Sequence, residues 1–185
     1  MLDDDLLPAP VRDAARMLED FKARLGSGSD LWVFGYASLI WRPEFEAAEE
    51  RPAIVHGWHR ALRMGSRVNR RTPEGPGLVF ALVAGGSCRG VVYGLPRERL
   101  DVELERLWQR EMPTPVYDPR LVSCRTPAGE VQALAFTLSR SSPSYVGELA
   151  DDELLEILGK ACGRFGSTLH YLLGAPPSLR RCGIP

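Results

Sequence analysis

The stretch from Leu31 to Pro43, LWVFGYASLIWRP, constrains the fold of this chain more than any other. It opens with four large apolar residues in a row, which is typical of a strand buried on both faces. The run then narrows to small residues after Gly35, carries one hydroxyl at Ser38, and becomes apolar again, which we interpret as a strand that pauses there and then resumes. A glycine inside such a strand indicates a bend, where backbone N–H groups can line a cavity. The same pattern also fits a core strand without a functional role, and both interpretations stay open.

The apolar runs after Pro43 predict a sheet made of short strands. We expect a strand over residues 53–64, a hairpin formed by 78–83 and 88–95, and a second pair formed by 116–125 and 130–138. The turn of the first hairpin is assigned to Ala84–Ser87 (AGGS). Short strands separated by glycine- and proline-rich turns favour an antiparallel or mixed sheet, which can curl into a barrel.

Three segments have the apolar spacing of amphipathic helices. The first, residues 10–25, is expected to pack on the outside of the domain and to carry no chemistry. The second ends before Pro113, because proline cannot continue a helix. The third contains Gly163 and Gly166, which either allow another element to come close or break the helix into two pieces. Its apolar positions are Leu155, Leu158, Cys162, Phe165 and Leu169.

Length, charge and terminal composition narrow the class of protein. The 185 residues suit one domain, which we divide into an N-terminal helical extension (1–30) and a main domain (31–185). The formal net charge of −1 gives no general reason to bind nucleic acid or an anionic membrane. No apolar run reaches the roughly 18 residues of a membrane span, and the acidic start MLDDDLLPAP is unlike a secretion signal. These features predict a cytoplasmic protein.

The potential metal ligands are scattered along the chain. The four cysteines contain no CxxC pair, and the three histidines form no cluster with them. This spacing fits reduced thiols better than a disulfide framework or a zinc site. We therefore expect no metal.

Glu111 is the residue to which the helix pattern gives most weight. It shares one face of the second helix with four large apolar residues, Leu100, Leu104, Leu107 and Trp108. A carboxylate in such surroundings is costly unless it is paired, and desolvation raises its pKa towards neutrality. That environment suits a general acid or base. The alternative is a structural ion pair with Arg106, Arg110 or another arginine at the end of the helix.

Ser38 and the arginines of residues 60–71 invite further functional interpretations. Ser38 lies in GYASL, which is not the G-x-S-x-G elbow of the hydrolases, so a serine nucleophile served by His56 or His59 is disfavoured. The arginines could hold a carboxylate or a phosphate through charged hydrogen bonds, but a solvated loop accounts for them more simply. No phosphate-binding glycine motif is present.

Four motifs, taken in order, resemble those of the ChaC-type γ-glutamylcyclotransferases. VFGYASLIWRP resembles the family's V-F-G-Y-G-S-L-I-W stretch, and RTPEGPGLVFALVAGGSCRGVVYGLP is similar to its R-G-T-P-E-x-P-G segment and the strands that follow. REMPTPVYDP resembles the R-E-M…Y segment, and GRFGSTLHYLL resembles the closing G-R-x-G-S…Y-L pattern. The resemblance covers nearly all of residues 31–184, and the N-terminal helix lies outside it.

The resemblance implies an α+β fold, a γ-glutamylcyclotransferase-like small mixed β-barrel with flanking α-helices. It also implies a lyase that converts glutathione to 5-oxoproline and Cys-Gly without a metal or an organic cofactor, with a small molecule as its partner. The family's catalytic glutamate falls on Glu111. Its substrate-holding residues fall on Tyr36, Ala37, Ser38, Leu39, Tyr117 and Tyr145, and Arg70 of the arginine loop is added as a further substrate contact.

The chemistry of the implied reaction needs both a base and a group of donors. The substrate's α-amine must lose a proton and attack its own γ-carbonyl, and this intramolecular attack needs little beyond a folded substrate. Glu111 would take the proton and return it to the departing nitrogen. Backbone N–H groups of residues 37–39 would stabilise the substrate carboxylate or the developing oxyanion.

Two residues depart from the family's pattern. Ala37 replaces a glycine; a positive φ would cost alanine about 1 kcal/mol, whereas a negative φ would mean only an added methyl group near the substrate. Arg71 replaces the glycine of R-G-T-P-E. Neither change removes Glu111, but both leave open a cyclotransferase for another γ-glutamyl peptide or a γ-glutamylamine. A further alternative, from another class, is a non-catalytic γ-glutamyl-binding or regulatory protein, and the presence of Glu111 argues against it.

Overall fold

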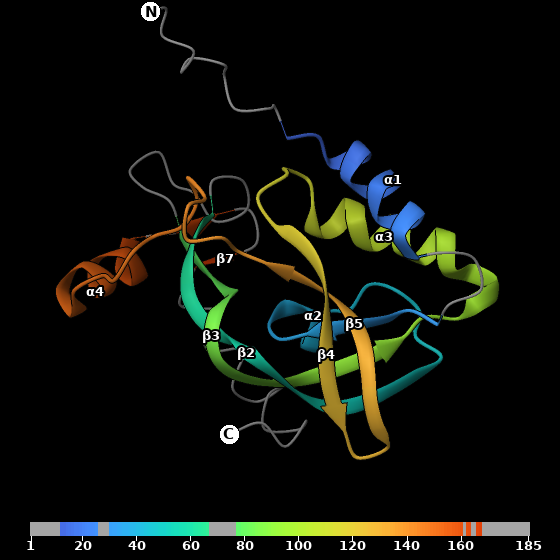
Figure 1. The fold of residues 1–185 in the computed structure, drawn as a ribbon. Coiled ribbons are helices and arrows are strands. Elements are labelled where there is room, and N and C mark those ends of the chain that lie inside the picture. The colour runs from blue at the N-terminus through green and yellow to red at the C-terminus, as the bar shows by residue number, and fades with distance from the viewer. Residues whose placement is uncertain (1–11, 26–29, 67–76, 161, 164–165, 168–185) are drawn as a thin grey trace, which may run out of the picture.

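The computed structural model describes residues 12–25, 30–66, 77–160, 162–163 and 166–167 (Figure 1). Five strands close into a barrel in the order β1-β3-β2-β4-β5. They are β1 (Trp32–Gly35), β2 (Glu49–Ser66), β3 (Gly77–Gly94), β4 (Asp118–Thr126) and β5 (Gly129–Thr137). The short β1 pairs antiparallel with β3 and parallel with β5, and this mixed pairing closes the barrel. The predicted small mixed β-barrel is confirmed.

The helices flank the barrel. They are α1 (Ala14–Leu25), α2 (Ser38–Trp41), the 3₁₀ turn η1 (Arg97–Arg99), α3 (Leu100–Glu111) and α4 (Asp151–Lys160). Figure 1 shows α1 alongside α3 on one side of the barrel, with α4 well apart from them. The rings of Phe21 in α1 and Trp108 in α3 lie 5.9 Å apart, and the Trp108 indole N–H donates to the Ala14 carbonyl at 2.7 Å. Phe21 is thus part of the core, and the domain boundary at residue 30 stays a prediction.

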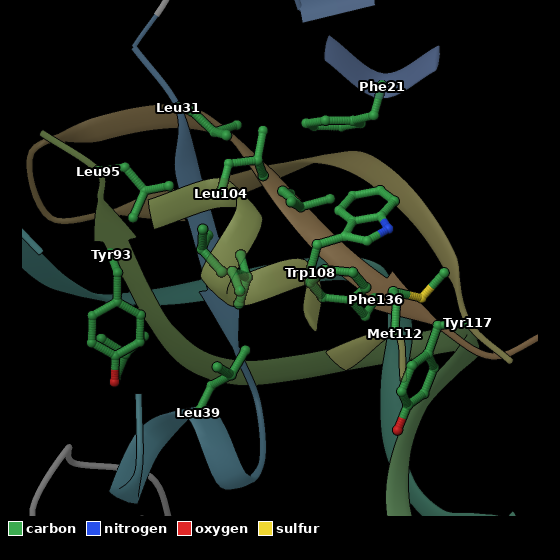
Figure 2. Close-up of a cluster of buried hydrophobic side chains, with 14 of the residues drawn as sticks. Phe21, Leu31, Leu39, Tyr93, Leu95, Leu104, Trp108, Met112, Tyr117 and Phe136 are labelled. Carbon is green, nitrogen blue, oxygen red and sulfur yellow. The ribbon is translucent and has the colours of Figure 1, made fainter. Parts of the chain in front are cut away.

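Alternation along the strands builds two apolar clusters. The outer cluster lies between the barrel and the helices, and it includes Val33, Leu134 and Phe136 from the strands and Leu104, Leu107 and Trp108 from α3. The inner cluster fills the barrel with the intervening residues, such as Phe34, Ala133 and Ala135. Because successive side chains of a strand point to opposite faces, the same strands supply both clusters. Figure 2 shows the outer cluster, with Leu39 and Tyr117 at its lower edge.

The predicted hairpin at Ala84–Ser87 is wrong. Residues 77–94 form one continuous strand that pairs with β2 along its whole length. Gly85 and Gly86 do have the positive φ angles of a turn, 107° and 70°, but opposite them β2 has its own irregularity at Gly57 (φ 81°). Both strands therefore bend together, as they do at a β-bulge.

Two helix and strand assignments also need correction. The apolar residues after Ser38 do not resume the strand, because residues 38–41 form the single turn α2. The third helix ends at Lys160, and residues 162–163 pair with 166–167 as the two-residue strands β6 (Cys162–Gly163) and β7 (Gly166–Ser167). Leu155, assigned to the apolar face, is 68% exposed. Phe165 and Leu169 lie outside the described residues.

Candidate active site

Glu111 occupies the last position of α3, where the buried face of the helix reaches the surface. Leu104, Leu107 and Trp108 precede it on that face and are at most 3% exposed. The helix closes with the Met112 N–H donating to the Trp108 carbonyl at 2.7 Å. The Glu111 side chain itself is 12% exposed, so it is largely removed from water but still reachable.

The charges around Glu111 act on its pKa in opposite directions. Desolvation by burial raises the pKa and is the dominant cause. The guanidinium of Arg110, which donates to Oε1 of Glu111, lowers it, and the nearby carboxylate of Glu44 raises it. The net direction is upward, towards the range in which a carboxyl transfers protons efficiently at neutral pH. The two interpretations of the sequence, proton transfer and an ion pair, therefore apply to the same carboxylate.

Residues 36–39 link the two apolar clusters at the end of β1. Tyr36 and Ala37 pack in the inner cluster, whereas Leu39 packs in the outer cluster together with Met112, the neighbour of Glu111. The Tyr36 hydroxyl donates to the Phe136 carbonyl at 2.9 Å. Ser38 and Leu39 form the first turn of α2, so their N–H groups have no partner within the helix.

The φ angle of Ala37 decides whether alanine strains the backbone there or only adds a methyl group. Its φ is −142°, outside the left-handed region that favours glycine. Alanine in place of the family's glycine therefore adds one methyl group, and Ala37, which is 7% exposed as a residue, packs in the inner cluster.

The hydroxyl of Ser38 does not form a nucleophile pair. Within the described ranges it makes no hydrogen bond to a histidine, and the Nδ1 atom of His59 is 2.8 Å from the Gly85 carbonyl oxygen instead. His170 lies outside these ranges. Neither the sequence nor this geometry favours a serine hydrolase.

The two predicted pocket tyrosines pack against the outer cluster. Tyr117 is buried and meets Phe136 edge to face, with the ring centroids 6.3 Å apart. Tyr145 forms an isolated bridge with Met64 and packs against the same cluster. In Figure 2 Tyr117 lies next to Met112, with its hydroxyl pointing away from α3. The structure thus gathers Leu39, Tyr117 and Tyr145 around the cluster in which α3 ends.

The arginines that the structure describes in this region hold the backbone. Arg60 donates to the Tyr36 carbonyl at 2.7 Å, and Arg63 donates to the Gly147 carbonyl at 2.7 Å. Arg70, predicted to contact substrate, and Arg71 lie outside the described residues.

Two carboxylates near the site were missed in the sequence. Glu44 has no signal in the sequence, because its place depends on the loop after α2. Glu103 does have one: it lies eight residues before Glu111 on the same helix face, and it is fully buried between Arg99 and Arg106 at 2.8 and 3.3 Å. Its spacing on the apolar face is therefore the sequence signal by which Glu103 can be found.

A hollow of about 1080 Å³ lies elsewhere, lined by residues of α1, β2, β4 and β5. Its lining includes Phe21, Trp58, Arg120 and Asp118, and none of the predicted site residues. We place the candidate site at Glu111, because proton transfer needs a group whose environment perturbs its pKa. Among the described residues, no group of three or more His, Cys, Asp or Glu side chains could hold a metal ion.

Comparison with known protein families matches residues 31–185 to the ChaC-like proteins. The chain belongs to the ChaC-like family. The glutathione-specific γ-glutamylcyclotransferase of Escherichia coli is 32% identical over 184 residues, covering 99% of this chain and 79% of that protein. The human glutathione-specific γ-glutamylcyclotransferase 1 is 30% identical, covering 94% of this chain and 81% of that protein.

Solved structures agree with the fold of this ChaC-like chain. The crystal structure of a yeast γ-glutamyl cyclotransferase specific to glutathione superposes with a TM-score of 0.75 at 22% identity, covering 83% of this chain and 88% of that one. The family predicted from the four motifs is confirmed. No helix in the described part of the ChaC-like chain is long and apolar enough to cross a membrane.

Proposed function

We propose that this ChaC-like chain is a cytoplasmic γ-glutamylcyclotransferase that converts glutathione to 5-oxoproline and Cys-Gly, with Glu111 as its acid/base. The observation that carries the proposal is a largely buried carboxylate at the end of α3, in a chain whose relatives are named for this activity. Its raised pKa suits a group that must both accept and return a proton.

The reaction is balanced without a cofactor or water. Glu111 takes a proton from the substrate's α-ammonium, and the freed amine forms a bond to the γ-carbonyl carbon. As the γ-amide bond breaks, Glu111 gives this proton to the departing cysteinyl nitrogen, and the regenerated carboxylate accepts the second proton that the attacking nitrogen must lose to become the lactam N–H. That second proton passes to the released amine of Cys-Gly, so both protons of the α-nitrogen are accounted for. Because attacking and attacked atoms belong to one molecule, the enzyme mainly has to fold the substrate and transfer protons between its two nitrogens.

The remaining predicted residues take supporting roles in this proposal. The N–H groups of residues 37–39 stabilise the α-carboxylate or the oxyanion, which the first turn of α2 favours because its donors have no partner within the helix. Tyr36, Leu39, Tyr117, Tyr145 and Arg70 stay as proposed substrate contacts.

A product assay with matched variants tests the proposal. Purified protein incubated with glutathione should release equal amounts of 5-oxoproline and Cys-Gly, and Glu111→Gln should lower kcat by about 10²- to 10⁴-fold. Glu105→Gln is the control, since Glu105 is a glutamate of the same helix on its exposed side, paired with Lys22. Normal turnover by Glu111→Gln would overturn the mechanism.

The substrate is tested separately with a panel of γ-glutamyl peptides and γ-glutamylamines. Ala37, a proposed substrate contact at which the family's pattern has glycine, is the departure that makes another γ-glutamyl compound the second candidate. Turnover of a different compound with no turnover of glutathione would select that candidate. Binding without any product would select the non-catalytic alternative.

A further inference from the structure

The guanidinium of Arg110 joins Glu111 to the loop that follows α2. Its Nη1 donates to Oε1 of Glu111, and its Nη2 donates to the Arg42 carbonyl at 2.5 Å. Its Nε lies 3.3 Å from Oε2 of Glu44, as an ion pair without a hydrogen bond. The Arg110 side chain is only 16% exposed, so one buried cation is shared between two carboxylates.

The loop that carries Glu44 is fixed at both of its ends. At one end Arg110 holds the Arg42 carbonyl, and at the other the Glu46 N–H donates to Oε2 of the buried Glu103 at 3.2 Å. Arg99 also bridges Glu46 and Glu103. Glu44 can therefore not follow Arg110 freely, and its carboxylate lies against Nε of the guanidinium, whereas Glu111 accepts from Nη1.

Glu44 also has an unusual backbone. Its φ of 57° is the only positive φ at a non-glycine residue within the described ranges. The left-handed region costs such a residue of order 1 kcal/mol, and conformations of this kind gather at functional sites. The anchored Glu46 two residues later restricts this segment, and in this conformation the Glu44 carboxylate lies 3.3 Å from Nε of Arg110.

We propose that Arg110 and Glu44 are positioning residues that set the protonation and the orientation of Glu111, an inference that rests on the proposed function. Arg110 occupies Oε1, and within the described part of the chain Oε2 of Glu111 has no hydrogen-bond partner. Oε2 is therefore the oxygen that meets the substrate's ammonium. The negative charge of Glu44 partly compensates the positive charge of Arg110, so the carboxylate of Glu111 stays basic enough to take the proton.

Among the residues that the structure describes, the charged groups that act on Glu111 do so in known directions. Arg110 of α3 favours the ionised form of Glu111, and Glu44 of the loop favours the protonated form. The guanidinium of Arg42 lies 3.1 Å from Oε1 of Glu44 and weakens the effect of that carboxylate. Removing Glu44 and removing Arg110 must therefore move the titration of Glu111 in opposite directions.

The pH dependence of kcat/KM for glutathione tests the inference. The acid limb reports the ionisation of Glu111 in the free enzyme. Glu44→Gln should move this limb to lower pH, because the ionised form no longer faces a like charge. Arg110→Gln should move it to higher pH and also lower kcat about ten- to hundredfold, because Oε1 loses its anchor. Arg110→Lys should return the limb towards the wild-type position while kcat stays low.

Glu49→Gln is the matched control for charge removal. Glu49 is half-exposed like Glu44 and is paired with one arginine, Arg51, at 2.5 Å on β2. Its removal should leave the limb in place. The inference would be overturned if the acid limb shifted in the same direction in Glu44→Gln and Arg110→Gln. It would also be overturned if neither variant shifted the limb by more than the control does.

A titration without substrate separates this inference from the proposed function. Carbon-detected NMR of the Glu111 carboxyl measures its pKa directly in wild type and in both variants. Relative to wild type, this pKa should be lower in Glu44→Gln and higher in Arg110→Gln. If wild type forms no 5-oxoproline but these pKa shifts appear, the function fails and the charge balance stands. If wild type is active and the pKa shifts are absent, the charge balance fails alone.

Discussion

Gly90 on β3 is the position where a single methyl group should disturb both the barrel and the candidate site. A Cβ atom there would lie 2.7 Å from the Cε2 and Cζ atoms of Phe34, and closer still to the carbonyl oxygen of Gly35. Carbon atoms in ordinary contact are about 3.5 Å apart, so the Phe34 ring would have to retreat by roughly 0.8 Å. Phe34 is fully buried, and Gly35 is held by its pairing in β1, so neither can move cheaply.

We therefore expect Gly90→Ala to cost about 3 kcal/mol of unfolding free energy, the upper part of the range for overpacked cores. For a chain of this size that corresponds to a fall in Tm of about 6 to 12 °C. Urea unfolding followed by far-UV circular dichroism measures the first quantity, and calorimetry measures the second. The displaced Gly35 carbonyl precedes Tyr36 directly, so KM for glutathione should rise as well.

Gly94→Ala is the control on the same strand. Its Cβ would lie 3.4 Å from the nearest ring atoms of Trp32, which is close to ordinary contact, and the cost should not exceed about 1 kcal/mol. Equal unfolding free energies for the two variants would show that the close approach of β3 to β1 is not the constraint we infer.

Two further predictions concern stability. Burial raises the pKa of Glu111 above its ordinary value of 4.5, so the folded chain binds the carboxyl proton of Glu111 more tightly than the unfolded chain does. The contribution of Glu111 to stability therefore falls as pH rises from 4.5 through the pKa of the folded state. Glu111→Gln should therefore gain stability relative to wild type as pH rises above about 4.5, measured by urea unfolding at a series of pH values, and a difference that stays constant with pH would contradict this. Ala37→Gly should cost about 1 to 2 kcal/mol by the same measurement, because it removes a buried methyl group and frees a backbone with negative φ; an unchanged or higher stability would mean that alanine is strained there.

The helix that carries Glu111 could be read from the sequence because its signals are local. The apolar spacing from Leu100 to Trp108 has one period, Pro113 stops it, and the observed helix ends at Glu111. The fifth position of the face is a carboxylate, and no tertiary information is needed to see that it is costly there. The pair β4 and β5 was equally accessible, since residues 126–129 separate two apolar runs.

The elements that were misread depend on what lies opposite them. Gly85 and Gly86 have the dihedral freedom of a turn, but whether a strand turns or bends there is decided by Gly57 on the partner strand. The apolar residues 39–41 fit one turn of helix as well as a strand, because a run this short has no period. Leu155 fits an apolar face by spacing, yet α4 leaves it exposed.

The charge balance at the site could not be predicted for a related reason. The sequence indicates Arg110 as one possible ion-pair partner of Glu111. It does not indicate that Arg110 is shared between two carboxylates, because this requires Glu44 in a left-handed conformation that its residue type does not favour. The loop in that conformation is anchored by the Glu46 N–H, which donates to the buried carboxylate of Glu103. Glu103 lies two turns of α3 before Glu111.

The apolar face of α3 thus has two effects that cannot be separated. Burial of Leu104, Leu107 and Trp108 holds the helix on the barrel, and the same burial continues to Glu111 and raises its pKa. A more exposed helix end would leave an ordinary carboxylate, too weak a base for an ammonium, whereas a fully enclosed one would keep its proton and exclude the substrate. The cation of Arg110, shared with Glu44, adjusts the carboxylate between these limits at the surface of the molecule, where a loop can change without disturbing the core.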